Sequence, residues 1–265
     1  MAQIKISLIN QSSVVTDAEA SKAVKALQKQ VRLHFYPPWG VDADLTFVAK
    51  GKTPAAKTWW LAILDNSDEA GALGYHDITT DGLPLGKIFA KTDQQYGTSW
   101  TATASHELLE MLGDPDINLT TFVQTTNTAG ILYAYEVADA CEADNFGYKI
   151  DGVLVSDFVF PSWFEAFRKA GTQFDYGNHI KKPFQLLPGG YISYFDVANG
   201  GGWQQKTAEK GPSYKYAARP HVGSRRERRR TPRDQWLVST VKHKPTSTAF
   251  SSNGVMLTIE RSLRA

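Results

Sequence analysis

The segment from Ser105 to Asp116 contains side chains that could hold a metal ion and activate water. His106 and Glu110 are four residues apart, so on an α-helix they lie above one another on one face and can share a cation. Glu107 follows His106 and could hold a water molecule at that cation as a general base. The spacing therefore predicts a hydrolytic metal centre, with His106 and Glu110 as ligands and Glu107 as the catalytic residue.

End signals and apolar residues define the helix that carries this segment. We expect it to begin near Ser99 or Thr101 and to run to Leu112. Gly113 is expected to adopt a left-handed conformation that stops the helix, and Pro115 prevents its continuation. Four apolar residues indicate that the helix is mostly buried: Leu108, Leu109, Met111 and Leu112. Its polar residues would then need internal partners.

Strands and one further helix precede this element. Residues 4–10 alternate as a strand, and apolar residues repeat at helical spacing over 17–31. The other strands expected before the motif are 45–48, 59–64 and the pair 72–76 and 85–90, which flanks a turn at 80–82. After the motif we expect a hairpin at 148–155, a short helix at 162–168, a strand at 191–196 and a closing hairpin within 235–263. The pattern predicts an α+β fold.

The His-Glu-x-x-Glu string, preceded by a strand, a helix and several strands, resembles the zincins. In this metallopeptidase superfamily a twisted mixed sheet lies over an active-site helix. The resemblance covers roughly residues 1–165 by organisation, and its specific parts are 106–116 and 133–142. It implies that His106 binds Zn²⁺, that Glu107 is the general base, and that Glu110 replaces the usual second histidine.

The resemblance also implies a division of the chain. Residues 1–115 would form an upper subdomain with the metal helix, and 116–214 a smaller, irregular and β-rich lower subdomain with the third ligand. Residues 215–265 would form a basic loop and the closing hairpin.

Two branches of the superfamily imply different third ligands. Read as H-E-x-x-E-x-x-G-x-x-D, the chain resembles the metzincins and places Asp116 on the metal, but none of its three methionines suits their methionine turn. Read with the segment Glu136-Val-Ala-Asp139, it resembles the gluzincins, which implies Glu136 as third ligand and Asp139 as the carboxylate that orients the histidine. The acids downstream favour the gluzincin branch, with Asp116 and Asp139 as alternative ligands. The segment from Glu136 to Cys141 also resembles uncharacterised proteins that pair a His-Glu-x-x-Glu helix with Glu-x-x-Asp-x-Cys.

The function implied by this resemblance is a zinc-dependent metalloendopeptidase acting on a peptide or protein substrate. Tyr191, Tyr194 and His221 are candidates to stabilise the oxyanion of the transition state. Because a carboxylate at Glu110 makes zinc a weaker Lewis acid, a catalytically inactive binding or structural protein is an alternative. A calcium-stabilised interaction module built from the acids of 136–144 is another.

Composition limits the remaining functional classes. The chain has 265 residues and a formal charge of +2, which gives no general attraction to nucleic acid or to an anionic membrane. The basic run Arg225–Arg230 is short and favours a solvated loop. Cys141 is the single cysteine, so no internal disulfide is possible, and it is expected to be a small buried side chain. Without a signal-peptide pattern or a membrane span, we expect a cytoplasmic protein, with release by lysis or an injection apparatus left open.

Overall fold

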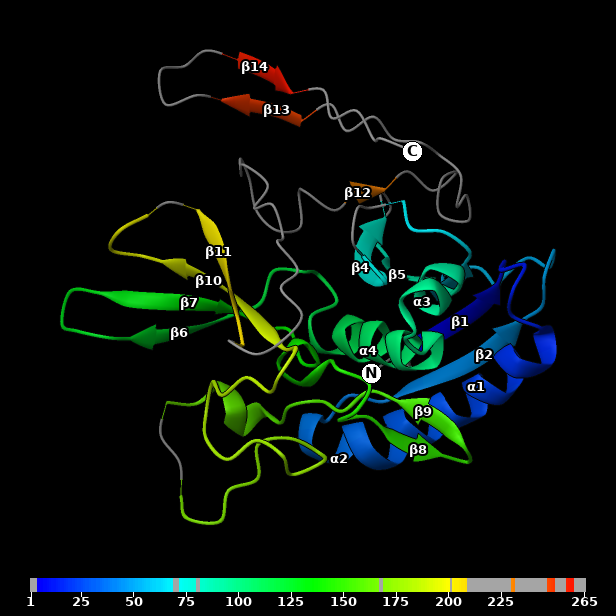
Figure 1. The fold of residues 1–265 in the computed structure, drawn as a ribbon, viewed down its shortest axis with the longest axis horizontal. Helices are drawn as coiled ribbons and strands as arrows, with labels where there is room; N and C mark the ends of the chain where they lie inside the picture. The colour runs from blue at the N-terminus through cyan, green and yellow to red at the C-terminus, as the bar shows by residue number, and fades with distance from the viewer. Residues whose placement is uncertain are drawn as a thin grey trace.

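The computed structural model describes residues 4–68, 72–79, 82–166, 169–200 and 202–208, and the backbone of 230–231, 247–250 and 256–259. Helices and strands are mixed along the chain, which confirms the α+β class. Two main sheets lie on either side of a central helix, α4 (Trp100–Gly113), as Figure 1 shows. Among these residues no helix is long and apolar enough to cross a membrane.

The larger sheet is mixed and has the order β12-β4-β5-β3-β1-β2. Its inner strands run parallel, and β4 runs antiparallel to β5. Every residue of β5 is buried, as expected for a parallel strand covered on both faces. The strands are β1 (Ile4–Asn10), β2 (Ala43–Val48), β3 (Trp59–Leu64), β4 (Gly74–Thr79), β5 (Pro84–Phe89) and β12 (Arg230–Thr231). The predicted pairing of 72–76 with 85–90 is confirmed as the β4–β5 pair.

The helices pack against one face of this sheet. Thr16 caps the start of helix α1 (Asp17–Lys29) in a capping box with Glu19, and the helix contacts β1 and β2. Helix α4 contacts β3, β4 and β5, and one apolar core lies between both helices and the sheet. A π-helical segment (Gln30–Phe35), α2 (Tyr36–Trp39) and α3 (Ala90–Tyr96) complete the helical elements of the described residues before α4.

The second sheet is antiparallel, with the order β11-β10-β7-β6. It consists of β6 (Thr120–Gln124), β7 (Gly130–Ala134), β10 (Tyr191–Asp196) and β11 (Trp203–Thr207). Between β7 and β10 lie a 3₁₀ helix (Asp139–Cys141), the hairpin β8 (Tyr148–Ile150) and β9 (Val153–Val155), and a second 3₁₀ helix (Pro161–Phe164). Near the end of the chain, β13 (Ser247–Phe250) pairs with β14 (Met256–Ile259). The hairpin expected at 148–155 and the strand expected at 191–196 are confirmed.

Two local predictions need correction. Gly113 is the last residue of α4 and does not have a positive φ, so it is not a left-handed stop. Its Cα instead lies so close to Val137 that an added Cβ would be 2.6 Å from Val137 Cγ1. The short helix expected at 162–168 is a 3₁₀ helix that begins at Pro161 and ends at Phe164.

Candidate metal centre

Three elements bring the candidate ligands together. Helix α4 carries His106, Glu107 and Glu110 on its successive turns. Strand β4 adds His76, the segment between β7 and the first 3₁₀ helix adds Glu136, and the first residue of that 3₁₀ helix is Asp139. These elements are separate in the sequence but converge at α4, near the middle of the molecule (Figure 1).

Glycines in the sheet allow α4 to approach it closely. A Cβ on Gly86 would lie 2.6 Å from Leu61 Cδ1 and 2.8 Å from Met111 Sδ. A Cβ on Gly74 would lie 2.9 Å from Glu107 Oε1. The close approach sets the face of α4 that carries Glu107 against the strand that carries His76.

The first group of candidate ligands is His106, Glu110 and Asp139. His106 Nε2 lies 3.3 Å from Glu110 Oε1 and 3.2 Å from Asp139 Oδ1. Both carboxylates are almost fully buried, and the His106 side chain is 12% exposed. One nitrogen and two carboxylate oxygens around one point form a donor set that suits Zn²⁺.

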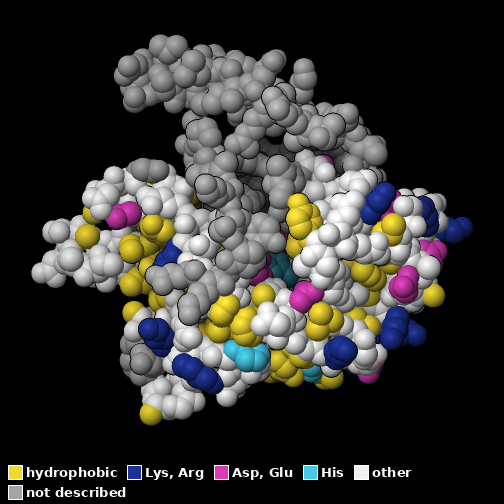
Figure 2. Space-filling model, in the orientation of Figure 1, with side chains coloured by type: hydrophobic (Ala, Val, Ile, Leu, Met, Phe, Trp, Pro, Cys, Tyr) yellow, Lys and Arg dark blue, Asp and Glu magenta, His cyan; other side chains and the backbone are white. Residues whose placement is uncertain are grey.

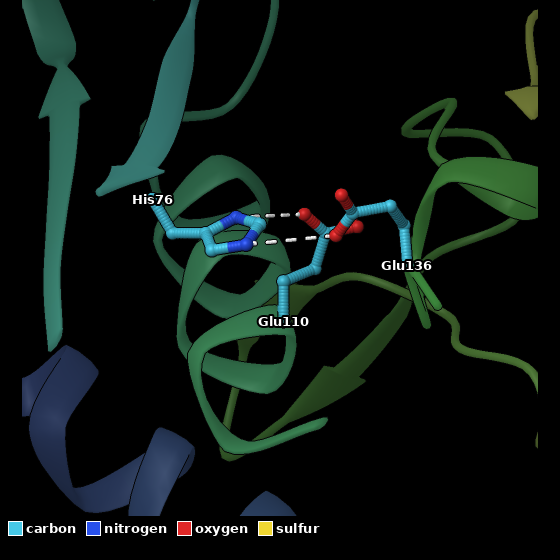
Figure 3. A group of neighbouring side chains, drawn as sticks. All are labelled: His76, Glu110 and Glu136. Carbon is cyan, nitrogen blue, oxygen red and sulfur yellow. Dashed lines mark ion pairs between the residues drawn. The ribbon is translucent and has the colours of Figure 1, made fainter. Parts of the chain in front are cut away.

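The second group is His76, Glu110 and Glu136. His76 Nδ1 lies 3.1 Å from Glu110 Oε2, and His76 Nε2 lies 3.5 Å from Glu136 Oε2. Figure 3 shows the imidazole of His76 facing both carboxylates, which come from α4 on one side and from the loop on the other. Glu107 Oε2 lies 3.6 Å from His76 Nδ1. Glu110 therefore belongs to both groups, with a different oxygen directed to each histidine.

Three buried oxygens test whether these residues fit a cation. Glu107, Glu110 and Asp139 are 5%, 3% and 3% exposed. Within the described part of the chain, Glu107 Oε2, Glu110 Oε1 and Asp139 Oδ1 accept no hydrogen bond. Burying a carboxylate without such partners is costly unless a positive charge compensates it. The residues therefore fit a metal ion. Figure 2 shows histidine and acidic side chains deep in a hollow near the centre of one face.

The charges of the cluster shift several pKa values. Burial opposes protonation of His106, but Glu110 and Asp139 outweigh it and raise the pKa of His106. Burial alone would raise the pKa of Glu110, but His106 and His76 lower it well below its ordinary value. Burial and the neighbouring Glu110 raise the pKa of Asp139. Burial also raises the pKa of Glu142 to about 7. The cluster thus holds negative charge at Glu110 and attracts positive charge.

Polar contacts around the cluster hold α4 in place. Asp144 Oδ2 accepts a hydrogen bond from the backbone N–H of Ser99 at the start of the helix. Ser105 Oγ donates to Gln30 Oε1 and accepts from the backbone N–H of Ser156. At the other end, Asp114 accepts hydrogen bonds from the backbone of the following turn. These contacts fix the rotation of α4 and with it the directions of His106 and Glu110.

Three of the other residues predicted for the site lie among the described residues: Asp116, Tyr191 and Tyr194. Asp116 is exposed and belongs to neither group of ligands. Tyr191 is the first residue of β10, and the Tyr194 hydroxyl donates a hydrogen bond to Gln204 Oε1 in the neighbouring strand. His221 and the run Arg225–Arg230 lie outside the residues whose side chains the structure describes.

His76 was missed by sequence reasoning, although its strand was expected. It is 2% exposed and lies in register with Gly86 of β5. The feature of the sequence that could have pointed to His76 is the alternation of side chains along β4, which puts His76 on the same face as Gly74. That alternation alone does not reveal that this face meets α4.

A third group, Asp157, Asp175 and His179, shares no residue with the first two. Backbone N–H groups donate to both buried carboxylates, from Phe158 and Gly177 to Asp157 and from His179 and Ile180 to Asp175. His179 Nδ1 lies 3.2 Å from Asp157 Oδ2. Because these carboxylates already have donors, we interpret the group as a structural link between two loops.

Comparison with models of known protein families, with curated proteins and with solved structures finds no match to this chain.

Proposed function

We propose that this protein is a zinc-dependent endopeptidase. The observation that carries the proposal is the convergence of His106 Nε2, Glu110 Oε1 and Asp139 Oδ1, with the two carboxylate oxygens buried and lacking hydrogen-bond donors among the described residues. His106, Glu110 and Asp139 would hold the zinc ion. When bound there, zinc supplies a Lewis acid that polarises the scissile carbonyl and acidifies water.

Glu107 is the proposed general base. It lies on α4 next to His106, and its Oε2 is buried without a hydrogen-bond donor among the described residues. A carboxylate in this position takes a proton from the attacking water and passes it to the leaving amine. Asp93 lies near enough to influence this carboxylate, and burial raises the pKa of Asp93 to about 7 against hydrogen bonds from Thr103 and Thr98.

The fold and the helix motif support a zincin-like arrangement. The mixed sheet packs on α4, as the resemblance of the His-Glu-x-x-Glu string implies. Glu136, the third ligand implied by the gluzincin branch, lies on the same segment as Asp139 but faces His76. The proposal therefore assigns the third position on the zinc held by His106 to Asp139.

Two substitutions in α4 test the proposal. Glu107→Gln should lower hydrolysis of a peptide library by about 100-fold or more while the zinc content stays at the wild-type level, because only the base is lost. His106→Ala should lose the zinc held by His106. Glu165→Gln, an exposed site after the second 3₁₀ helix, is the matched control and should keep both properties.

The same variants can contradict the proposal. Zinc retained in full by His106→Ala would remove the ligand assignment. Wild-type hydrolysis by Glu107→Gln would remove the assigned base.

The second candidate is a catalytically inactive protein that keeps zinc for stability. The burial of the cluster favours it, because the side chains of His76, Glu107, Glu110, Glu136 and Asp139 are all less than a tenth exposed. For this candidate, neither the wild type nor Glu107→Gln hydrolyses any peptide, and chelation of zinc lowers the melting temperature.

A further inference from the structure

We propose that the site holds two divalent cations, with Glu110 as the ligand that bridges them. His106 and Asp139 would complete the first position, which is the one in the proposed function. His76 and Glu136 would complete a second position beside it. The inference rests on the proposed function, because Glu110 is also a ligand of the zinc ion in that proposal.

The two oxygens of Glu110 carry the geometric argument. Oε1 lies 3.3 Å from His106 Nε2, and Oε2 lies 3.1 Å from His76 Nδ1. One carboxylate thus faces two imidazoles that come from different elements, α4 and β4. In two-metal sites the ions lie about 3.5–4 Å apart, a separation that the two oxygens of one carboxylate can span. A neutral histidine in place of Glu110 offers one unprotonated nitrogen and could bridge two ions only by losing its second proton.

Each position also has a second carboxylate of its own. Asp139 Oδ1 lies 3.2 Å from His106 Nε2, on the side of the first group. Glu136 Oε2 lies 3.5 Å from His76 Nε2, on the side of the second group (Figure 3). Each cation would therefore have one imidazole, one carboxylate and a share of Glu110. Mixed nitrogen and oxygen donors of this kind suit Zn²⁺, Co²⁺ and Mn²⁺.

Charge supports two ions over one. The cluster contains four carboxylates, from Glu107, Glu110, Glu136 and Asp139, and all four residues are less than a tenth exposed. One divalent ion would leave two negative charges buried if all four groups were ionised, whereas two divalent ions would balance them. Glu107 Oε2 gives independent support, because it is buried without a hydrogen-bond donor in the described residues and lies 3.6 Å from His76 Nδ1.

The competing explanation is that His76 is a protonated partner that holds Glu110 and Glu136 without a metal. Both ring nitrogens of His76 face carboxylates, as this explanation requires. The two explanations differ in the number of metal ions bound per chain, which can be counted.

The test is a metal count on the full chain. Metal-free protein is loaded with Zn²⁺, freed of loosely bound ions and measured by native mass spectrometry. We expect two ions in the wild type, one in His76→Ala and one in Glu136→Gln, each with a wild-type circular dichroism spectrum. His179→Ala is the control, because it alters the only other candidate ligand group among the described residues and should keep two ions.

The outcomes separate this inference from the proposed function. One ion in the wild type, lost in His106→Ala but kept in His76→Ala, overturns the second position and leaves the proposed function intact. No tightly bound ion in the wild type overturns both. Two ions in His76→Ala, or loss of one in His179→Ala, places the second ion elsewhere and overturns the inference.

A measurement on the wild type covers the case in which the variants fail to fold. The metal-free protein is loaded with Mn²⁺ and studied by electron paramagnetic resonance. Two Mn²⁺ ions bridged by Glu110 should give an exchange-coupled spectrum with hyperfine splitting about half that of a single ion. A spectrum of isolated Mn²⁺ alone at full loading contradicts the bridged pair.

Discussion

At the scale of single residues, we expect the buried pair Asp157 and Asp175, which belongs to neither group of proposed zinc ligands, to make the stability depend on pH. Asp157 and Asp175 are both 0% exposed. Burial raises the pKa of Asp157 from the ordinary 3.8 to about 7, and Asp175 beside it adds to the shift. His179 lies beside the pair, with Nδ1 3.2 Å from Asp157 Oδ2. The other titratable side chains near Asp157 are the buried thiol of Cys141 and the hydroxyls of Tyr148 and Tyr176.

The sign of the effect follows from proton binding. Between about pH 4 and pH 7 the folded protein keeps a proton on Asp157 that the unfolded chain has released. The stability contributed by that proton is complete below about pH 4 and is lost as the pH rises to about 7. Three pKa units correspond to about 4 kcal/mol as an upper limit.

Asp157→Asn should remove this dependence, because the amide resembles the protonated carboxyl. We expect the zinc-loaded variant to lose less stability than the wild type between pH 4 and pH 7, measured as the free energy of unfolding in urea. Asp151→Asn is the control, since Asp151 is exposed and forms a surface ion pair with Lys29. Parallel pH curves for the wild type and Asp157→Asn would contradict the assignment.

The candidate site could be predicted where its residues share one helix. The spacing of His106, Glu107 and Glu110 is informative because helix geometry fixes their relative directions. Glu136 and Asp139 were expected from their acidic segment, but which histidine each faces depends on how the loop folds over α4. His76 was not expected, because its approach to α4 depends on the order of strands in the sheet.

At the scale of elements, the contact between Gly113 and Val137 sets the distance from α4 to the loop that carries Glu136 and Asp139. A Cβ on Gly113 would lie 2.6 Å from Val137 Cγ1, and Val137 is fully buried. An alanine at this position must displace the Val137 side chain or the loop that carries it. The glycine is thus needed for close packing, whereas the sequence suggested a role in ending the helix.

Gly113→Ala should therefore lower zinc affinity by about tenfold or more and cost about 1–3 kcal/mol of stability. Zinc affinity is measured by competition with a chelator, and stability by urea unfolding. Val137→Ala relieves the same contact, so the double variant should recover part of the affinity lost in Gly113→Ala. Simple addition of the two effects would contradict a direct contact.

Elements with a clear period were predicted better than their arrangement. Strands β1, β3 and β10 and helix α1 follow from alternation or helical spacing, which depend on local sequence. The π-helical segment after α1 has no such signal. The sheet order depends on contacts between distant strands, such as β1 lying between β3 and β2.

At the scale of the whole molecule, the candidate metal centre joins the two parts of the fold. His76, His106 and Glu110 belong to the larger sheet and its helix, and Glu136 and Asp139 precede the second core. That second core contains Cys141, Trp163 and Ile192. A cation bound to both parts would oppose their separation, because binding to the folded state alone adds to its stability.

The rate at which a thiol reagent modifies Cys141 can measure this linkage. Cys141 is 0% exposed and follows Asp139 by two residues. Burial raises the pKa of its thiol, and the nearby Asp157 and Asp175 raise it further. A thiol reagent can therefore modify Cys141 only during transient opening of the segment that holds Asp139. Removing zinc with a chelator should speed this modification by about 100-fold relative to protein at a zinc concentration of about 100 times the dissociation constant.

Labelling in the presence and absence of zinc, followed by mass spectrometry, would give these rates. His106→Ala is the control, because it lacks a ligand of the first ion and its labelling rate should not depend on that ion. Equal rates with and without zinc in the wild type would contradict the linkage. Because the chain has one cysteine, every labelled molecule reports the same event. The labelling rate of Cys141 thus reports how often the second core separates from α4.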